Sequence, residues 1–200
     1  MPTVVACLGD SITEGSPHWD SRSRTGDPTG QWEYWAGLAH PELELRNFGI
    51  WGERTDEIAA RFDEAVEGAE VLIVQGGIND IAQGRSLAAA AEQLAAMVER
   101  GLALGLRVAV CDVLPWNNGW PGAEAPIREL NALIASLEVP LLPFHDTLED
   151  PDLPGRMKLE WTDADGDHPS IAGYRRLGES AFQSSIRLLR TDDDSATEAV

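Results

Sequence analysis

Apolar residues gather in five short runs that recur at fairly regular intervals along the chain. Several runs are apolar at consecutive positions and rich in Val, Leu and Ile, which is typical of strands covered on both faces of a sheet. The five predicted strands span residues 3–8, 43–48, 71–75, 107–113 and 139–144.

Amphipathic segments lie between the runs. The strongest, residues 86–104, is rich in Ala and Leu, with Ser86 as its predicted N-cap and Gly105 at its end. In residues 55–67, Thr55 is the predicted N-cap ahead of acidic residues in the first turn. Alternating strands and helices predict an α/β fold, with helices on both faces of a parallel sheet. The other predicted helices span residues 31–40, 126–137 and 170–189.

The chain has 200 residues, 43% of them hydrophobic, which suits one globular domain with a sizeable core. We predict a single domain over residues 1–190, because no linker interrupts them. Residues 191–200 are polar and acidic without periodicity, and we expect a disordered tail there. Residues 15–30 form a long polar loop, and loops of that length in compact domains are often functional.

The net charge of −19 and the sequence pI near 4.4 narrow the choice of partners. An acidic surface repels phosphate backbones and anionic lipids, so nucleic acid and membrane surfaces are poor candidates. Strongly anionic substrates would need a local Arg. The same charge also serves solubility alone, which is the more general explanation.

Both cysteines, Cys7 and Cys111, lie in apolar runs, so we expect buried free thiols and no disulfide. Only six residues precede Cys7, and no segment has the character of a signal peptide or of a membrane-spanning helix. We therefore expect a cytoplasmic protein, unless a signal peptide has been trimmed from the sequence.

Polar segments follow the predicted strands, at the edge where open parallel sheets bind their ligands. Ser11 comes after the first strand, and His168 comes after the fifth. A serine hydroxyl is a weak nucleophile until a base takes its proton, and histidine suits that task because it titrates near neutrality. A carboxylate holds the imidazole in the required tautomer, and preorganised N–H donors stabilise the oxyanion of ester attack. The segments read GDSITEG (9–15), NFGIWGERT (47–55), GGIND (76–80) and DADGDHPS (163–170).

These four segments, in this order, resemble the conserved blocks of the SGNH hydrolases, also called GDSL-type esterases and lipases. The resemblance extends over roughly residues 4–178. It implies a flavodoxin-like three-layer α/β/α sandwich with a five-stranded parallel sheet, and acyl-ester hydrolysis without a cofactor. On this resemblance Ser11 is the nucleophile, and Asp165 and His168 match the Asp-x-x-His pair that completes the triad.

The same resemblance assigns an oxyanion hole to the N–H groups of Ser11 and Gly52 and to the Asn79 amide. A glycine at position 52 would let the backbone approach the substrate with no Cβ in the way. Simpler roles exist, since Ser11 could be a plain helix N-cap and Asn79 a loop-stabilising amide. Asp10 and Asp80 are expected to bond the loop backbone.

The acid of the triad has three candidates close to His168 in the sequence. Asp165 has the spacing of the Asp-x-x-His pair and is our prediction. Asp163 and Asp167 would then be solvated carboxylates of the same loop.

The base has one serious rival among the four histidines. His145 ends the fifth apolar run and is followed by Asp146. His18 lies in the long loop and His40 precedes a proline at a helix end, so neither has a comparable setting.

Seven tryptophans are many for this length. Five fall in segments that should reach the catalytic rim, where they could stack a sugar ring or line an acyl or aryl pocket. Ordinary loop packing explains any single one equally well. Trp32 and Trp35 are expected to pack along a helix. The five rim candidates are Trp19, Trp51, Trp116, Trp120 and Trp161.

The sequence carries no metal-ligand spacing, phosphate-binding glycine loop or dinucleotide fingerprint, so we predict neither a metal nor another cofactor. We expect an esterase acting on a small-molecule ester, with short-chain acyl or aryl esters first and acetylated carbohydrates close behind. An acyltransferase would use the same residues and differ only in its acceptor. A non-catalytic flavodoxin-like binding domain is disfavoured, because all the catalytic positions are present. The sequence makes no prediction of oligomeric state.

Overall fold

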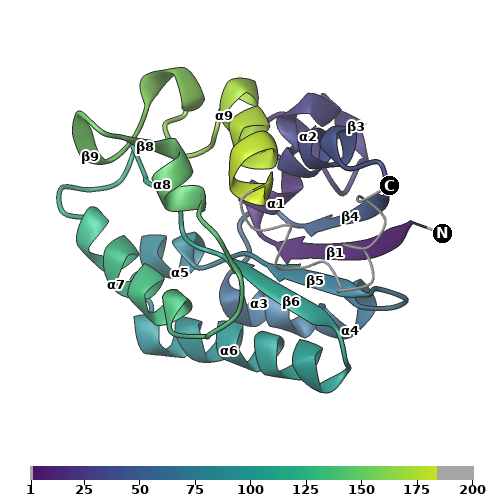
Figure 1. The fold of residues 1–200 in the computed structure, drawn as a ribbon. Coiled ribbons are helices and arrows are strands. Elements are labelled where there is room, and N and C mark those ends of the chain that lie inside the picture. The colour runs from purple at the N-terminus through teal and green to yellow at the C-terminus, as the bar shows by residue number, and fades with distance from the viewer. Residues whose placement is uncertain (1, 184–200) are drawn as a thin grey trace, which may run out of the picture.

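The computed structural model describes residues 2–183. Its central sheet has five parallel strands in the order β4-β1-β5-β6-β7 (Figure 1). Counted along the chain, this order is 2-1-3-4-5, the flavodoxin-like arrangement, and the predicted fold class is confirmed. The strands are β1 (Thr3–Gly9), β4 (Leu43–Gly49), β5 (Val71–Val74), β6 (Arg107–Cys111) and β7 (Leu141–Leu142).

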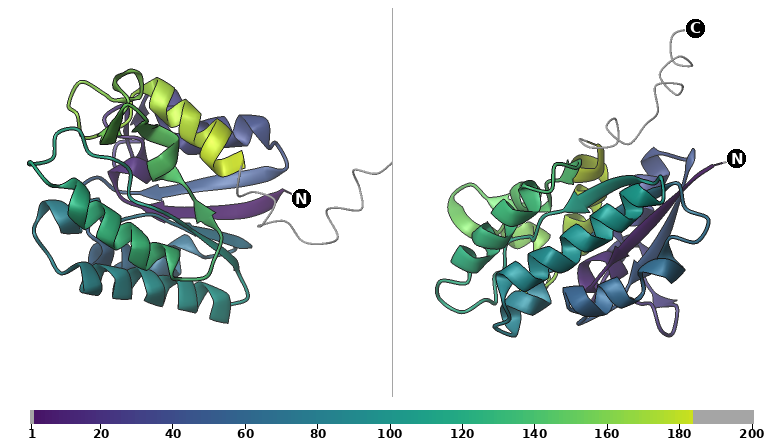
Figure 2. Two further views of the ribbon diagram at one scale, coloured as in Figure 1. Left: turned by 60° about the vertical axis from the view of Figure 1, so that its left-hand side comes forward. Right: turned by 90° about the horizontal axis from the view of Figure 1, so that it is seen from below.

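Helices cover both faces of the sheet and make the three layers seen in Figures 1 and 2. One face carries α2 (Trp32–Ala39), α8 (Phe144–Leu148), α9 (Ile171–Arg176) and the π-helical segment η3 (Leu177–Ala181). The other face carries α3 (Thr55–Ala60), α4 (Phe62–Ala65), α6 (Leu87–Ala103) and α7 (Glu124–Ala135).

The uninterrupted apolar runs follow from this double covering. In β1, Val5 and Cys7 pack into the cluster beneath α2 and α9, whereas Ala6 and Leu8 pack into the cluster beneath α3 and α6. Successive side chains of a strand point to opposite faces, so a strand covered on both sides needs apolar residues at every position. The same burial raises the pKa of the free Cys7 thiol well above its ordinary value.

The loops hold short elements that the sequence pattern does not predict. Two of them, α1 (Ser11–Glu14) and α5 (Ile78–Ala82), follow β1 and β5 directly. Other short elements are β2 (Trp19–Asp20), β3 (Thr25–Gly26), η1 (Pro28–Gly30), β8 (Glu149–Asp150), β9 (Leu153–Met157) and η2 (Leu159–Trp161). The predicted loop at residues 15–30 therefore contains a small hairpin and a 3₁₀ turn.

One predicted helix is interrupted. Residues 55–67 form α3 and α4 instead of one helix, with the break at Arg61. There the Arg61 guanidinium donates to the carbonyl oxygens of Phe48 at 3.0 Å and of Gly9 at 3.2 Å. The interruption thus fastens the carboxyl ends of β4 and β1 to the helical layer.

The predicted N-cap of α3 is wrong by one residue. Arg54 has the extended backbone of the N-cap, and Thr55 is the first helical residue. Thr55 is drawn inward, because its N–H and its hydroxyl donate to the Asp80 carboxylate at 2.9 and 3.1 Å. Asp80 therefore links the loop after β4 to α5. The predicted cap of α6 is confirmed, since Ser86 Oγ accepts the N–H of Ala89.

The fifth strand is shorter than predicted. Residues 139–144 were expected as a strand, but only Leu141–Leu142 pair with β6. Pro140 and Pro143 flank the pair, and proline has no N–H to give to a ladder. Phe144 already belongs to α8.

The last predicted helix begins as expected, with Ser170 as the N-cap of α9. Its central part widens into the π-helical segment η3. The predicted residues 184–189 lie outside the described residues, as does the predicted tail at 191–200. Within residues 2–183, no helix combines the length and the apolar character needed to cross a bilayer.

Candidate active site

Ser11 opens the short helix that follows the first strand. Asp10 caps this helix, because its carboxylate accepts the N–H of Ile12 at 2.9 Å, and Gly15 ends it at a φ of +100°. Since β1 lies between β4 and β5, Ser11 is at the switch point of the sheet, where doubly wound folds bind ligands. The first N–H groups of a helix have no acceptor within it, so α1 itself leaves the N–H of Ser11 unused.

Two glycines let the strands come close to α1. A Cβ on Gly49 would lie 2.0 Å from the backbone nitrogen of Glu14, a fixed atom. A Cβ on Gly9 would lie 2.6 Å from the Gln75 amide oxygen. That oxygen accepts the N–H of Asp10 at 3.1 Å, so glycine at both positions holds the turn before Ser11 against the sheet.

His168 and Asp165 reach Ser11 from the loop between η2 and α9. His168 Nε2 lies 3.0 Å from Ser11 Oγ, and His168 Nδ1 lies 2.7 Å from Asp165 Oδ2. The other oxygen of Asp165 accepts the N–H groups of Asp167 at 2.8 Å and of His168 at 3.0 Å. The carboxylate is therefore fixed by three bonds, and it orients an imidazole whose second nitrogen faces a hydroxyl.

Two carboxylates near Ser11 have opposite pKa shifts. Partial burial acts to raise the pKa of Asp165, but hydrogen bonds from the His168 ring and from two backbone N–H groups outweigh it, and the pKa lies below its ordinary value. Full burial raises the pKa of Asp10 to about 6, although the N–H of Ile12 stabilises its charged form. Asp165 is thus the firmly charged carboxylate beside the imidazole.

The two rival carboxylates of the same loop contact other side chains. Asp163 Oδ2 lies 3.3 Å from Nε2 of His18. Asp167 Oδ1 accepts the indole N–H of Trp116 at 2.6 Å. Of the three aspartates, Asp165 is the one that bonds the His168 ring.

The rival histidine lies in a different cluster. His145 is buried at the start of α8, where its backbone N–H donates to Asp112 Oδ1 at 2.7 Å. Its Nδ1 lies 3.5 Å from the exposed carboxylate of Asp146. A hollow of about 170 Å³ beside it is lined by Asp112, Arg128 and Asn131, and Ser11 is not part of it.

Gly52 lies in the loop after β4, and Asn79 lies in α5, directly after β5; these two strands flank β1 in the sheet. Gly52 has a φ of +80°, which favours glycine, and a Cβ built on it would have no heavy atom within 4 Å. Asn79 Nδ2 donates to the carbonyl of Glu53 at 2.9 Å. Because Glu53 follows Gly52 directly, this bond joins the loop after β4 to α5. An amide nitrogen has two N–H groups, so the second is left for another acceptor.

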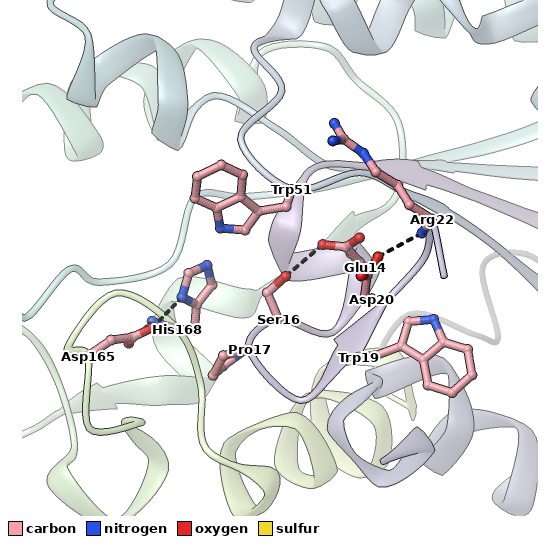
Figure 3. Close-up of a pocket in the computed structure, with 9 residues that line it drawn as sticks. All are labelled: Glu14, Ser16, Pro17, Trp19, Asp20, Arg22, Trp51, Asp165 and His168. Atoms are coloured by element: carbon pink, nitrogen blue, oxygen red, sulfur yellow. Dashed lines mark hydrogen bonds and ion pairs between the residues drawn. The ribbon is translucent and has the colours of Figure 1, made fainter. Parts of the chain in front are cut away.

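Two hollows meet beside His168. The inner pocket, about 150 Å³, is lined by Ser11 and Asn79 together with apolar side chains. The outer pocket, about 330 Å³, is lined by charged side chains from the 15–30 loop and by Asp165 (Figure 3). Trp51 and His168 belong to both, and Figure 3 shows the Trp51 ring lying across from the imidazole.

The five rim tryptophans have separate positions. Trp51 borders both pockets, Trp19 lines the outer pocket and Trp116 lines the inner one. Trp120 packs edge-on against Trp116, with 5.4 Å between ring centroids, so it supports the wall. Trp161 packs against the core with Arg176 over its ring at 4.2 Å, and it lines neither pocket.

Sequence reasoning missed several residues that shape this region. The Tyr174 hydroxyl donates to the carbonyl of Ser16 at 2.7 Å, which fastens the chain just after α1 to α9. Buried Glu14 accepts the hydroxyls of Ser16 and Ser21, both at 2.6 Å, and lines the outer pocket. Glu14 lies one helical turn after the candidate nucleophile, and that spacing was the signal available in the sequence.

The family model described as GDSL-like Lipase/Acylhydrolase matches residues 7–176. The chain belongs to this family. The match includes Ser11 and the loop that carries His168, and it supports a hydrolase that acts on ester bonds. No curated protein matches the sequence.

Solved structures share the fold at low sequence identity. A protein assigned to the G-D-S-L lipolytic family from Desulfitobacterium hafniense DCB-2 has a TM-score of 0.77 at 24% identity, over 90% of this chain and 98% of that one. A member of the lipolytic protein G-D-S-L family from Veillonella parvula DSM 2008 has a TM-score of 0.76 at 21% identity, over 92% and 99%. A GDSL-like lipase from Bacteroides thetaiotaomicron VPI-5482 has a TM-score of 0.70 at 22% identity, over 94% and 89%.

Proposed function

We propose that this protein is a serine esterase that hydrolyses small carboxylic esters, short-chain acyl or aryl esters first, through an acyl-enzyme on Ser11. One observation carries the proposal: the continuous line from Asp165 Oδ2 through the His168 ring to Ser11 Oγ, with steps of 2.7 and 3.0 Å. In such a line the carboxylate fixes the tautomer, the imidazole takes the hydroxyl proton and the oxygen becomes a nucleophile.

The reaction proceeds in two balanced halves. His168 Nε2 takes the proton of Ser11 as Oγ bonds to the ester carbon, and the carbonyl oxygen becomes an oxyanion. The intermediate collapses, the bond to the alcohol oxygen breaks and the alcohol leaves with the proton from His168. Water then gives a proton to His168 and bonds to the acyl carbon. The bond from that carbon to Ser11 Oγ breaks, Oγ takes the proton back from His168, and the acid is released.

Three N–H groups are proposed to stabilise the oxyanion: those of Ser11 and Gly52 and the free N–H of the Asn79 amide. The start of α1, the positive φ of Gly52 and the Asn79–Glu53 bond support this assignment, because each fixes a donor before the substrate arrives. A donor that needs no reorganisation at the moment of reaction lowers the barrier most.

The test is hydrolysis of p-nitrophenyl esters from acetate to decanoate by the intact chain and by Ser11→Ala. We expect activity on the short esters and its loss, by at least about a thousandfold, in Ser11→Ala. Ser136→Ala removes an exposed hydroxyl at the end of α7 and is the matched control with unchanged activity. Ester hydrolysis that survives in Ser11→Ala would disprove the mechanism.

Every step uses groups of the chain itself, so the proposed reaction requires no metal. Activity should persist after dialysis against EDTA, measured on the same p-nitrophenyl ester. Activity that is lost to EDTA and restored by a divalent ion would contradict the proposal. Product analysis with an added alcohol separates hydrolysis from acyl transfer to that alcohol.

A further inference from the structure

The two pockets beside His168 differ in what they contain. The inner pocket includes Ser11 and Asn79, the proposed nucleophile and a proposed oxyanion donor. The outer pocket includes His168 and Asp165 but neither of those two. An ester has two arms, and the reaction places different demands on each.

We propose that the inner pocket receives the acyl group and the outer pocket receives the alcohol, and that this division sets the substrate class: short acyl esters of polar alcohols that are neutral or positively charged. The inference rests on the proposed function. The ester carbon must contact Ser11 Oγ while its carbonyl oxygen faces Asn79, which places the acyl arm in the inner pocket. The alcohol oxygen must accept a proton from His168, which borders both pockets, so with the acyl arm in the inner pocket the alcohol arm takes the outer one.

The inner pocket suits a short, apolar acyl group. Beyond Ser11, Asn79 and His168, its lining is apolar except for Asp167: the other side chains are Ile12, Trp51, Ile78, Ala82 and Trp116. The indole N–H of Trp116 is already donated to Asp167 at 2.6 Å, so the ring offers only its apolar surface. An apolar cavity of roughly 150 Å³ accommodates a molecule the size of benzene, so a chain of about two to five carbons fits here.

The outer pocket has room for a larger and more polar group. Glu14, Asp20 and Asp165 contribute three carboxylates, against the single guanidinium of Arg22 (Figure 3). Glu14 is held in place by the hydroxyls of Ser16 and Ser21. An anionic alcohol would be repelled here, and the chain's net charge of −19 acts in the same direction.

Aromatic surface completes the outer pocket. Trp19 and Trp51 both line it, and Trp51 is 64% exposed. Indole faces attract cations and stack on sugar rings, and both kinds of group fit an acidic hollow. The alcohol part of the substrate is therefore either a neutral polyhydroxylated alcohol or a cationic one, and one assay can compare esters of both.

The acyl arm is tested with Ala82→Phe, which fills the inner pocket from the exposed end of α5. On p-nitrophenyl esters, we expect the ratio of kcat/KM for butyrate to that for acetate to fall about tenfold or more. Ala88→Phe, on the exposed face of α6, is the matched control and should leave the ratio unchanged. An unchanged butyrate-to-acetate ratio in Ala82→Phe would overturn the acyl assignment.

The alcohol arm is tested with three acetyl esters: acetylcholine, glycerol monoacetate and acetoxyacetate. The wild-type protein should hydrolyse the first two well and the anionic ester poorly. Asp20→Asn keeps the side-chain oxygen that accepts the N–H of Arg22 and removes one charge. It should narrow the cation-to-anion ratio of kcat/KM by about twofold to fivefold at low ionic strength.

Asp27→Asn is the control for that substitution, because Asp27 also caps a turn with its side chain, at Thr29. A cation-to-anion ratio that is equal in Asp20→Asn and in Asp27→Asn, or a wild-type preference for acetoxyacetate, would overturn the alcohol assignment. These results are distinct from failure of the proposed function, in which Ser11→Ala would hydrolyse all of these esters at the wild-type rate.

Discussion

His168 and His145 both follow the fifth strand and both lie beside carboxylates, but only the His168 ring also contacts a serine hydroxyl. The His168 ring is bonded at both nitrogens, at 2.7 Å to Asp165 and at 3.0 Å to Ser11. The His145 ring lies 3.5 Å from Asp146 through Nδ1, and its buried Nε2 has no hydrogen-bond partner within residues 2–183. Burial and a nearby carboxylate are thus insufficient to orient an imidazole.

The difference comes from what the carboxylates bond. Asp165 accepts two backbone N–H groups through one oxygen and offers the other to the imidazole. Asp112 accepts the backbone N–H of His145 and so fixes the start of α8. The nearest carboxylate to Nδ1 of the His145 ring is instead that of Asp146. The aspartate three residues before His168 in the same turn therefore pairs with its ring, whereas Asp112, which comes from the end of a different strand, bonds the backbone N–H of His145.

The largest expected effect separates the two histidines. His168→Ala should lower kcat/KM on p-nitrophenyl acetate by about ten-thousandfold or more, because it removes the proposed base for Ser11. His145→Gln should stay within about threefold, since that ring does not touch the reacting groups. The assay is run on variants whose thermal melting shows a folded protein. A comparable loss in His145→Gln would erase the contrast between the clusters.

The next effect separates the aspartates. Asp165→Asn should lower kcat by about a thousandfold, because an amide favours the wrong imidazole tautomer and gives no charge to stabilise the imidazolium. Asp163→Asn and Asp167→Asn remove carboxylates of the same loop that contact His18 and Trp116 instead, and each should cost less than about tenfold. If Asp167→Asn were the more damaging change, the assignment of the acid would be wrong.

Sequence reasoning predicted the sheet well because its signal is local. Residues at consecutive positions of β1 and β5 are apolar, and that pattern alone indicates strands covered on both faces. β7 was overestimated, because the ladder ends where Pro140 and Pro143 cannot donate. The break at Arg61 had no local signal, since it depends on carbonyl groups of two distant strands.

The candidate site was predictable in its residues but not in its walls. Ser11, Asp165 and His168 stood out by their spacing, and the structure brings them together. The same rim argument grouped Trp161 with Trp51, although Trp161 packs on the core beneath Arg176. Which side of a ring faces a pocket depends on tertiary packing, and sequence position does not carry that information.

A third contrast concerns the amides near each cluster. Asn79 donates one N–H to the Glu53 carbonyl and, within residues 2–183, keeps the other for the proposed oxyanion, whereas Asn131 bonds both the N–H and the carbonyl of Val113. Asn79→Ala should lower kcat by about a hundredfold to a thousandfold with little change in KM. Asn131→Ala should lower thermal stability and leave kcat within about threefold. A purely structural Asn79 would show the second pattern.

The smallest expected effect is on stability and concerns the second cluster. Burial raises the pKa of Asp112 to about 7, the N–H of His145 opposes that shift, and the charge of Asp146 adds to it. The folded state therefore favours the protonated form, so the fold is not penalised at low pH and loses stability as pH rises from about 4 to about 7.

Asp112→Asn keeps an acceptor for His145 and carries no charge. It should be more stable than the wild type above pH 7, by at most about 4 kcal/mol, and the difference should shrink to nothing as pH falls to about 4. Urea unfolding at several pH values measures this difference, with exposed Asp152→Asn as the control. The contributions of other buried acids cancel between wild type and variant. A difference in the free energy of unfolding that did not change with pH would therefore show that Asp112 is charged in the fold. The second cluster would then hold its carboxylate ionised, as the first does.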